Sequence, residues 1–441
     1  MPGRVKRRDP IELQIELALS PGVFIRDRAC YSFVSSLEGV VAEINALLAS
    51  DAARAAVLYE TFLAGCREKA EELDDSSGSF NMFAKGMICR WVKARQQSGS
   101  DADETAATLL AWMDDDPYAF CYEVEGQLSE ALDGRGQEAF DRVIRARYEA
   151  TPATEGYDRR RWSGVLRAIY LARRDATAYH NLAEQSGLTP KDCFALATMV
   201  RSRKPALALD WVERGIQLDG TAPFGYRAGY ELGQLRLELL AKLGRQDEAI
   251  EIAWAEFREH PSKRGFDDLM KMVPKAQRAA WREKALDAAQ GADLHSVMDL
   301  LTETKESERL AVLVRGVTDV DLENLSHYAT EPAAVMLDKS HPELAARLWC
   351  AQAFRIVDAG TRKYYDIALR NLDRARRCWL RAGGEREWAA TVRQIRAEHF
   401  RKRGFMSAFE RMAGGEKAES PPSFLERAKD RWGVNRRGRR S

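Results

Sequence analysis

Residues 232–261 read LGQLRLELLAKLGRQDEAIEIAWAEFREHP, and this stretch decides the fold class. Its leucines recur at steps of three, four and four residues, which places them on one face of a helix: Leu232, Leu235, Leu239 and Leu243. After a turn at Gly244, a second stripe recurs at four-residue steps: Ala249, Ala253 and Phe257. The stretch therefore predicts a helical hairpin in which each helix has one apolar face.

The second half of this hairpin resembles a tetratricopeptide repeat, in which small residues let paired helices approach closely; the residues concerned are Gly244, Ala249, Ala253, Phe257 and Pro261. Residues 205–218 have the pattern of a preceding helix, and residues 345–357 and 364–380 predict two longer ones. Each hairpin leaves an apolar face that only a neighbour can cover. We therefore expect an all-α fold, a tetratricopeptide-like α-solenoid of stacked helical hairpins.

Helix starts are marked by acceptor side chains and by proline. Asp101 precedes an apolar stripe over residues 102–113, with Glu104 three residues after it, and Thr189-Pro190 opens another helix. Asp116 followed by Pro117 repeats the signal, so a helix is expected to continue from there through Phe120, Cys121, Val124, Leu128 and Leu132. This interpretation makes the run Asp114 to Asp116 a turn with a cap. Trp112, Tyr118 and Phe120 flank the run and either line a pocket or belong to the core.

Composition and charge describe an ordinary globular chain of 441 residues, 31% charged and 45% apolar. No apolar run is long enough to span a bilayer, and the basic start lacks an apolar signal segment, so a cytoplasmic protein without membrane contact is expected. Residues 361–441 hold 22 Lys and Arg against 10 Asp and Glu, a net charge of +12. Since the whole chain carries +1, residues 1–360 carry −11. An acidic body is thus followed by a basic end.

Composition also suggests where the chain divides. We expect the following segments: a basic extension (1–25), a helical domain (26–150), tetratricopeptide-like repeats (151–320), a basic helical region (321–412), and a flexible linker with a basic tail (413–441). In the tail, Phe424, Leu425 and Trp432 fall on one face of a possible short helix, so the tail is either a docking peptide or a disordered solubilising end.

The basic helical region is the strongest candidate for binding. Four arginines recur at steps of four, three and four residues on one helical face: Arg370, Arg374, Arg377 and Arg381. Further cations extend the charge: Arg393, Arg396, Arg401, Lys402 and Arg403. Such a surface could meet the phosphates of a nucleic acid or an acidic protein partner. It could equally be the solvated face of ordinary helices.

Catalytic and metal-binding patterns are missing from the sequence. The seven cysteines are scattered without a C-x-x-C pair, and those at Cys66, Cys89, Cys121 and Cys193 sit among apolar residues at helical spacing. No phosphate-binding glycine loop or nucleophile elbow occurs, and the histidines are dispersed. We therefore expect no catalytic residue, no metal and no cofactor, and no small-molecule substrate is evident.

Two segments resemble known families. Residues 75–80 (DSSGSF), 91–95 (WVKAR) and 109–118 (LLAWMDDDPY) resemble a bacterial family of helical proteins of unassigned function. The part of this motif around the acidic run comprises Trp112, Asp116, Pro117, Tyr118 and Phe120. Residues 341–402 are similar to the helical region that follows the finger in SWIM-type zinc-finger proteins, although the C-x-C and C-x-H pairs of the finger are absent. The resemblance implies no activity.

Two functional hypotheses follow. The first is a non-catalytic scaffold or adaptor that mediates protein–protein interaction. The alternative is a protein that binds nucleic acid through its basic C-terminal helices. Helical folds can also hold active sites assembled from residues far apart in sequence, but no residue here points to one.

Overall fold

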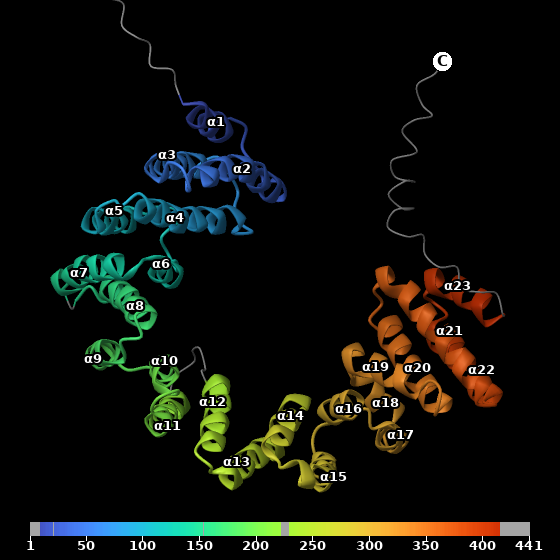
Figure 1. The fold of residues 1–441 in the computed structure, drawn as a ribbon. Helices are drawn as coiled ribbons and strands as arrows, with labels where there is room; N and C mark the ends of the chain where they lie inside the picture. Colours follow the sequence, from blue (N-terminus) through green and yellow to red (C-terminus); the bar gives the residue numbers. More distant parts are fainter. Residues whose placement is uncertain (1–8, 21, 153, 222–228, 415–441) are drawn as a thin grey trace, which may run out of the picture. The chain divides into compact units, whose positions relative to one another are not determined.

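The computed structural model describes residues 9–20, 22–152, 154–221 and 229–414, and every regular element in these ranges is a helix (Figure 1). Ile25 and Leu73 form an isolated parallel β-bridge outside any strand. The predicted all-α class is therefore confirmed. Among the described residues, no helix combines the length and the apolar character that crossing a membrane would require.

The chain divides into two compact units, residues 1–243 and residues 244–441, called here the N-terminal and C-terminal units. The finer boundaries expected after residues 150 and 320 stay predictions. The first helix lies inside the segment that we expected to be a basic extension, and it packs on the third helix. The residues predicted to dock through the tail, Phe424, Leu425 and Trp432, lie outside the described residues.

The N-terminal unit has these helices: α1 (Pro10–Leu19), α2 (Asp27–Leu47), α3 (Ala52–Ala70), α4 (Ser79–Gln97), α5 (Ala102–Asp114), α6 (Glu125–Ala131), α7 (Gly134–Ala150), α8 (Gly156–Ala172), α9 (Ala176–Ser186), α10 (Pro190–Val200), α11 (Pro205–Thr221) and α12 (Gly229–Lys242). Each packs mainly on helices one or two places away in the chain order. Large side chains that are almost fully buried hold this stack together, among them Tyr59, Phe62, Trp91 and Phe140. Burying each of them stabilises the fold by about 1.5–3 kcal/mol or more.

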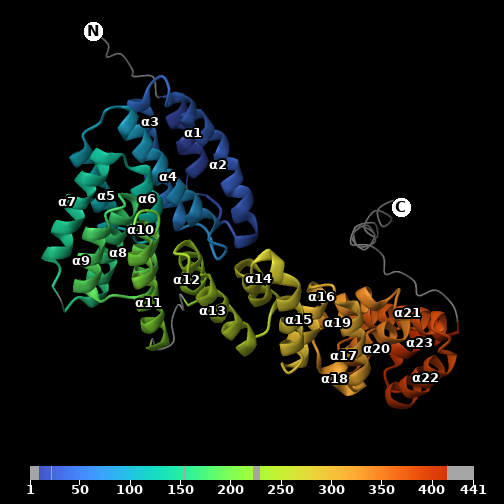
Figure 2. The ribbon, with the colours of Figure 1, turned by 60° about the horizontal axis from the view of Figure 1, so that its bottom comes forward.

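The C-terminal unit has these elements: α13 (Gln246–Glu259), α14 (Lys263–Met272), the 3₁₀-helix η1 (Lys275–Gln277), α15 (Arg278–Ala289), α16 (Leu294–Glu303), α17 (Ser307–Gly316), α18 (Asp319–Asn324), α19 (His327–Leu337), α20 (Pro342–Asp358), the 3₁₀-helix η2 (Arg362–Tyr364), α21 (Tyr365–Arg381), α22 (Glu385–His399) and α23 (Arg403–Ala413). Helices α20 and α21 lie side by side (Figure 1, Figure 2). Helix α19 packs on α20, and α21 also contacts α22 and α23. These packed helices position the candidate binding groove described below.

Local start signals are confirmed where a cap and a stripe agree. Helix α5 begins after Asp101, whose carboxylate accepts the N–H of Glu104 over 2.9 Å. Helix α10 begins after Thr189, which forms a reciprocal capping box with Asp192. The two longer helices expected over residues 345–357 and 364–380 correspond to α20 and α21. Of the cysteines expected among apolar residues, Cys66, Cys121 and Cys193 are buried, and Cys89 is half-buried.

The prediction that a helix begins at Asp116 is wrong. Residues 115–124 form turns, and helix α6 begins only at Glu125. Ala119 and Glu123 have positive φ angles of 57° and 59°, which end any helical run. Asp116 does cap, but it caps the turn: its two carboxylate oxygens accept the N–H groups of Phe120 (2.8 Å) and Cys121 (2.7 Å).

The hairpin that decided the fold class has the predicted helices, α12 and α13, with Gly244 at the turn between them. The φ angle of Gly244 is 75°, a left-handed conformation that glycine adopts without strain. The two helices belong to different compact units: α12 packs on α10 and α11, and α13 packs on α14 and α15. The tetratricopeptide pairing of these two helices stays a prediction.

Candidate functional site

The predicted arginine face lies along α21, and most of its charge is paired. Arg374 reaches Glu331 of α19 over 3.4 Å, and its guanidinium lies 4.4 Å from the ring centre of Trp349. Arg377 pairs with Asp373 one turn earlier on α21 over 3.0 Å. Such pairs are weak where they are exposed, but they neutralise charge that a phosphate backbone would otherwise meet.

At the end of the same face, Arg381 contacts Asp338 over 2.7 Å. The Arg381 guanidinium holds the pKa of the Asp338 carboxyl below its ordinary value, and a hydrogen bond from the Cys378 thiol over 3.0 Å adds to the effect. Asp338 therefore stays ionised at neutral pH and keeps Arg381 in place against α19.

The remaining predicted cations lie on α22, α23 and the turn between them. Arg396 pairs with Glu410 over 2.6 Å, and the ammonium of Lys402 donates a hydrogen bond to the carbonyl of Val357. Within the described ranges, the other three form no ion pair with a carboxylate: Arg393, Arg401 and Arg403. The predicted basic surface is thus a mixture of paired and unpaired cations.

A groove of about 650 Å³ opens among α19, α20, η2 and α21. This volume falls within the range of ligand pockets, about 300–1,000 Å³. Three arginines and one carboxylate line it: Arg355, Arg370, Arg374 and Glu331. Apolar side chains complete the lining, among them Ile356, Tyr364 and Ile367. The groove therefore combines a positive charge with an apolar surface.

Of the three groove arginines, Arg370 is the one whose guanidinium forms neither a hydrogen bond nor an ion pair with any described residue. Arg355 donates to the carbonyl of Leu325, and Arg374 is held by Glu331. Arg370 is exposed and forms no ion pair with any residue that the structure describes. A carboxylate that entered the groove could pair with Arg370 directly, because no described residue competes for its guanidinium.

Two buried carboxamides also line the groove, one from each of the tightly packed helices. Asn371 Nδ2 donates to Gln352 Oε1 over 3.1 Å, and both side chains are more than nine-tenths buried. Gln352 Nε2 has no hydrogen-bond partner within the described chain. A buried polar group without a partner costs about 1–3 kcal/mol.

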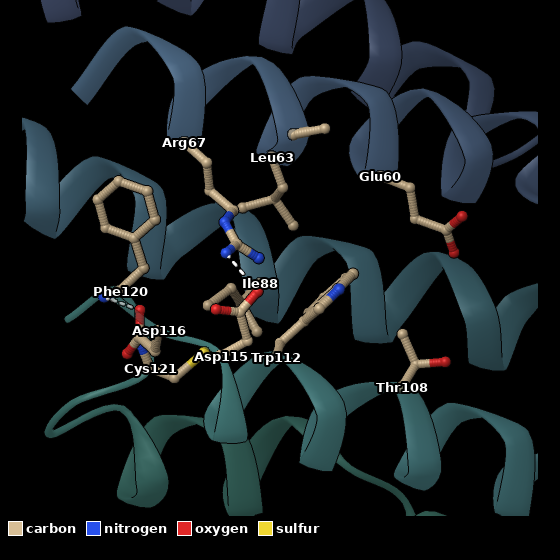
Figure 3. Close-up of a pocket in the computed structure, with 11 residues that line it drawn as sticks. Glu60, Leu63, Arg67, Ile88, Thr108, Trp112, Asp115, Asp116, Phe120 and Cys121 are labelled. Atoms are coloured by element: carbon tan, nitrogen blue, oxygen red, sulfur yellow. Dashed lines mark hydrogen bonds and ion pairs between the residues drawn. The ribbon is translucent and has the colours of Figure 1, made fainter. Parts of the chain in front are cut away.

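A second, smaller cavity of about 270 Å³ lies in the N-terminal unit, between α3, α4, α5 and the turns that follow α5 (Figure 3). Trp112 and Phe120 line it, as the sequence allowed, together with Leu63 and Ile88. Tyr118 does not: its hydroxyl donates to Glu71 over 3.0 Å. Asp115 is 77% exposed at the cavity, where it pairs with Arg67 over 2.7 Å.

The motif that carries the family resemblance forms two loops that pack together. In the first loop, Asp75 accepts hydrogen bonds from the N–H groups of Phe80 (2.9 Å) and Asn81 (2.8 Å). In the second loop, Asp116 accepts the N–H groups of Phe120 and Cys121 in the same way. Asn81 Nδ2 then donates to the carbonyls of Tyr118 (2.9 Å) and Ala119 (3.2 Å). The rings of Phe80 and Phe120 meet edge to face at 6.0 Å, and Pro117 is exposed at the turn. These contacts hold the two loops together next to the cavity, which Asp116 and Phe120 line.

The acidic run is accounted for by partners of its own. Asp114 pairs with Arg147 over 2.9 Å, Asp115 pairs with Arg67, and Asp116 caps the turn. Among the described residues, no three His, Cys, Asp or Glu side chains are grouped to hold a metal ion. Burial raises the pKa of the Cys121 thiol beside the cavity to about 12, so this thiol is protonated at neutral pH.

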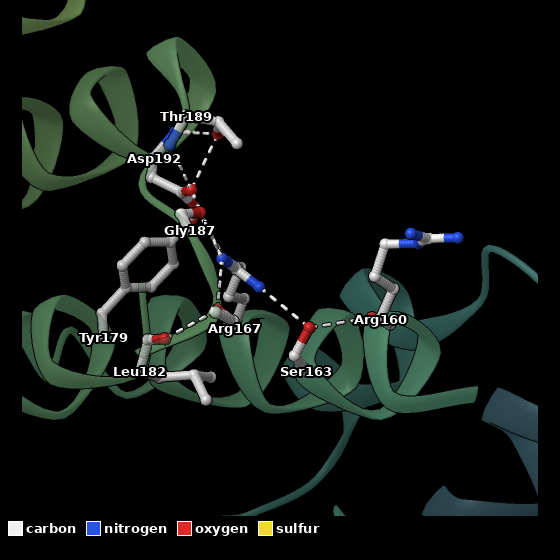
Figure 4. A network of polar contacts seen from close by, with 9 residues as sticks. Arg160, Ser163, Arg167, Tyr179, Leu182, Gly187, Thr189 and Asp192 are labelled. Atoms are coloured by element: carbon white, nitrogen blue, oxygen red, sulfur yellow. Dashed lines mark hydrogen bonds and ion pairs between the residues drawn. The ribbon is translucent and has the colours of Figure 1, made fainter. Parts of the chain in front are cut away.

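A buried polar network joins α8, α9 and α10 (Figure 4). Arg167 Nε donates to Asp192 Oδ1 over 2.8 Å, and the hydroxyl of Tyr179 donates to the same oxygen over 2.9 Å. Thr189 donates both its N–H and its hydroxyl to Asp192 Oδ2. Ser163 accepts from Arg167 over 3.0 Å. Because Asp192 has a donor at each oxygen, the network locks three consecutive helices and leaves that carboxylate no free acceptor for a ligand.

The sequence pointed to Arg370 and Arg374 but not to the rest of the groove, because Glu331, Arg355 and Tyr364 come from separate elements. One signal was present. Gln352 is a lone polar residue inside an otherwise apolar stretch, WCAQAF at residues 349–354, and a polar residue at such a position marks a buried polar contact.

No curated protein matches the chain in sequence. A family model described as a family of unknown function, DUF6880, matches residues 23–408, which is most of the chain and includes the groove, the cavity and both motif loops. The chain therefore belongs to the DUF6880 family of unknown function.

Proposed function

We propose that this protein is a helical scaffold for protein–protein interaction, and that its C-terminal unit binds an acidic segment of a partner protein in the α19–α21 groove. The architecture supports a tetratricopeptide-like α-solenoid, because the helices of the N-terminal unit pack on near neighbours along the chain. Proteins of this kind bind extended segments through surfaces formed by successive helices.

The observation that carries the proposal is Arg370 in the groove. Its guanidinium forms no ion pair within the described residues, and it stands beside Tyr364 and Ile367, which are 42% and 37% exposed. Exposed apolar side chains next to an unpaired arginine are typical of binding hot spots. A segment with a carboxylate near an apolar side chain would use both features.

A protein partner fits this surface better than nucleic acid does. Arg374, Arg377 and Arg381 each already contact a carboxylate, so phosphates spaced along the arginine face would have to displace those partners. Nucleic-acid binding through the unpaired Arg393, Arg401 and Arg403 is the alternative that the experiment must separate.

The test is affinity capture of the full chain from its native cell, with and without nuclease, comparing Arg370→Glu with Arg393→Glu. Both substitutions reverse an unpaired charge, and only Arg370 lies in the groove. The proposal expects Arg370→Glu to lose partners that survive nuclease, whereas Arg393→Glu keeps them. The opposite result would favour the nucleic-acid alternative: partners are lost after nuclease treatment and with Arg393→Glu, but are kept with Arg370→Glu. That result would contradict the proposal that the groove binds a protein partner.

Three further expectations belong to this proposal. The protein acts in the cytoplasm and is bacterial, and its residues 341–402 share the helical region found after the finger in SWIM-type proteins. They are supported only by the motifs and composition of the sequence. The same holds for the absence of an activity of its own.

A further inference from the structure

The cavity of the N-terminal unit has chemistry opposite to that of the groove. Among its lining residues, Glu60, Asp115 and Asp116 are acidic and only Arg67 is basic, so its formal charge is negative. Its remaining wall is largely apolar and includes Trp112. The groove is lined by three arginines and a single carboxylate.

Two of the three carboxylates remain open to a ligand. Both oxygens of Asp116 are occupied by N–H groups of the turn. Asp115 gives one oxygen to Arg67 and is 77% exposed, so its other oxygen faces solvent. Glu60 accepts a hydrogen bond from the buried Trp91 indole over 2.8 Å through Oε1, and its second oxygen has no donor among the described residues.

Trp112 stands between these two acceptors. Figure 3 shows its indole between Glu60, which projects from α3, and the pair of Arg67 with Asp115. Its ring centre lies 4.5 Å from that of the buried Trp91, which packs against it and restricts its orientation. A cation within about 6 Å of a tryptophan face gains about 0.5–2 kcal/mol.

We propose that this cavity binds the side chain of a lysine or arginine from a protein partner. The apolar stem of such a side chain would lie along Leu63, Ile88 and Phe120, as long cationic side chains cover apolar surface elsewhere in proteins. Its charged end would reach Glu60 beside the indole of Trp112. At about 270 Å³ the cavity suits one side chain rather than a drug-sized molecule.

Arg67 does not oppose this ligand, because its pair with Asp115 over 2.7 Å carries no net charge, so the attraction for a cation comes mainly from Glu60. An anionic ligand is disfavoured, since it would face the unsatisfied oxygen of Glu60 and the exposed oxygen of Asp115. The site is independent of the groove: it lies in the other unit and recognises the opposite charge.

The probe for the test is a fluorescein-labelled decapeptide of alternating lysine and glycine, titrated with the full chain and followed by fluorescence anisotropy. The test variant combines Glu60→Gln with Asp115→Asn, which keeps the acceptors for Trp91 and Arg67 and removes both charges. The matched control is Asp103→Asn, which removes an exposed carboxylate of α5 that pairs with Arg142 outside the cavity. The proposal expects affinity to fall about tenfold or more for the double variant and to stay unchanged for the control.

A second variant keeps the test valid if the first is poorly folded. Thr108 lines the cavity from α5, and among the described residues its hydroxyl donates only to the carbonyl of Glu104, one turn earlier. Thr108→Lys would place a cation in the cavity and should weaken peptide binding by about tenfold. Equal peptide affinity for wild type, the double variant and Thr108→Lys would overturn the proposal. Arg370→Glu should leave lysine-peptide binding unchanged, so a failure here and a failure of the groove are distinguishable.

Discussion

Asn371 and Gln352 are joined by a hydrogen bond of 3.1 Å between the packed helices α21 and α20, and Gln352 Nε2 is left without a partner in the described chain. Replacing both carboxamides by leucine removes the buried polar atoms together and should leave stability near that of wild type or above it. Asn371→Leu alone should cost about 1–3 kcal/mol, because it also leaves Gln352 Oε1 unsatisfied. Urea unfolding of the three proteins measures the difference. A double variant less stable than the single one would contradict the pairing.

The network around Asp192 predicts a large effect from one arginine. Arg167→Met leaves the buried carboxylate of Asp192 without its cation and should cost about 3–5 kcal/mol. Arg160→Met on the same helix is the control, since the Arg160 side chain is exposed and only its carbonyl joins the network. Thermal unfolding of both variants decides the matter. Similar melting temperatures for the two would show that the network does not lock α8 to α10.

The ion pair of Asp338 with Arg381 predicts a specific dependence on acid. Because the pair lowers the pKa of Asp338 below its ordinary 3.8, its contribution is complete above that value and is lost as the pH falls through the lowered pKa. The difference in stability between wild type and Asp338→Asn should therefore be constant from pH 7 to pH 5 and shrink below about pH 3.8. It should be modest, about 1 kcal/mol or less, because the side chains are about 37% and 49% exposed. Melting temperatures measured across that range check it, and a difference that grows in acid would contradict it.

A substitution at Ala119 can distinguish the observed turns from the helix that the sequence predicts. At a φ of 57°, Ala119→Gly should be neutral or slightly stabilising, since glycine adopts this conformation without strain. In a helix the same change would cost about 1 kcal/mol. Chemical unfolding of this one variant distinguishes the two structures.

What the sequence predicted well is local. Thr189 and Asp192 are three residues apart, so their capping box could be read directly, and the stripes of α20 and α21 recur within single helices. What it missed depends on distant segments. The sequence pattern shows Arg374 and Arg381 as unpaired cations on one helical face. It cannot show their partners, Glu331 and Asp338, because each lies 43 residues earlier in the chain. An aspartate before proline is the same sequence signal in a helix cap and in the turn at Asp116. The positive φ angle of Ala119 and the hydrogen bonds from Asn81 to Tyr118 and Ala119 distinguish the two, and they depend on a distant segment.

The most direct measurement is the affinity of the full chain for a fluorescein-labelled, glutamate-rich decapeptide with a central leucine, followed by anisotropy at low and moderate salt. Wild type should bind it, and Arg370→Glu should weaken binding about tenfold or more, while Arg393→Glu leaves it unchanged. Circular dichroism should show the same helical content in all three proteins. Binding that is equally weak in wild type and Arg370→Glu, or that depends on Arg393 instead, would contradict an acidic partner in the α19–α21 groove.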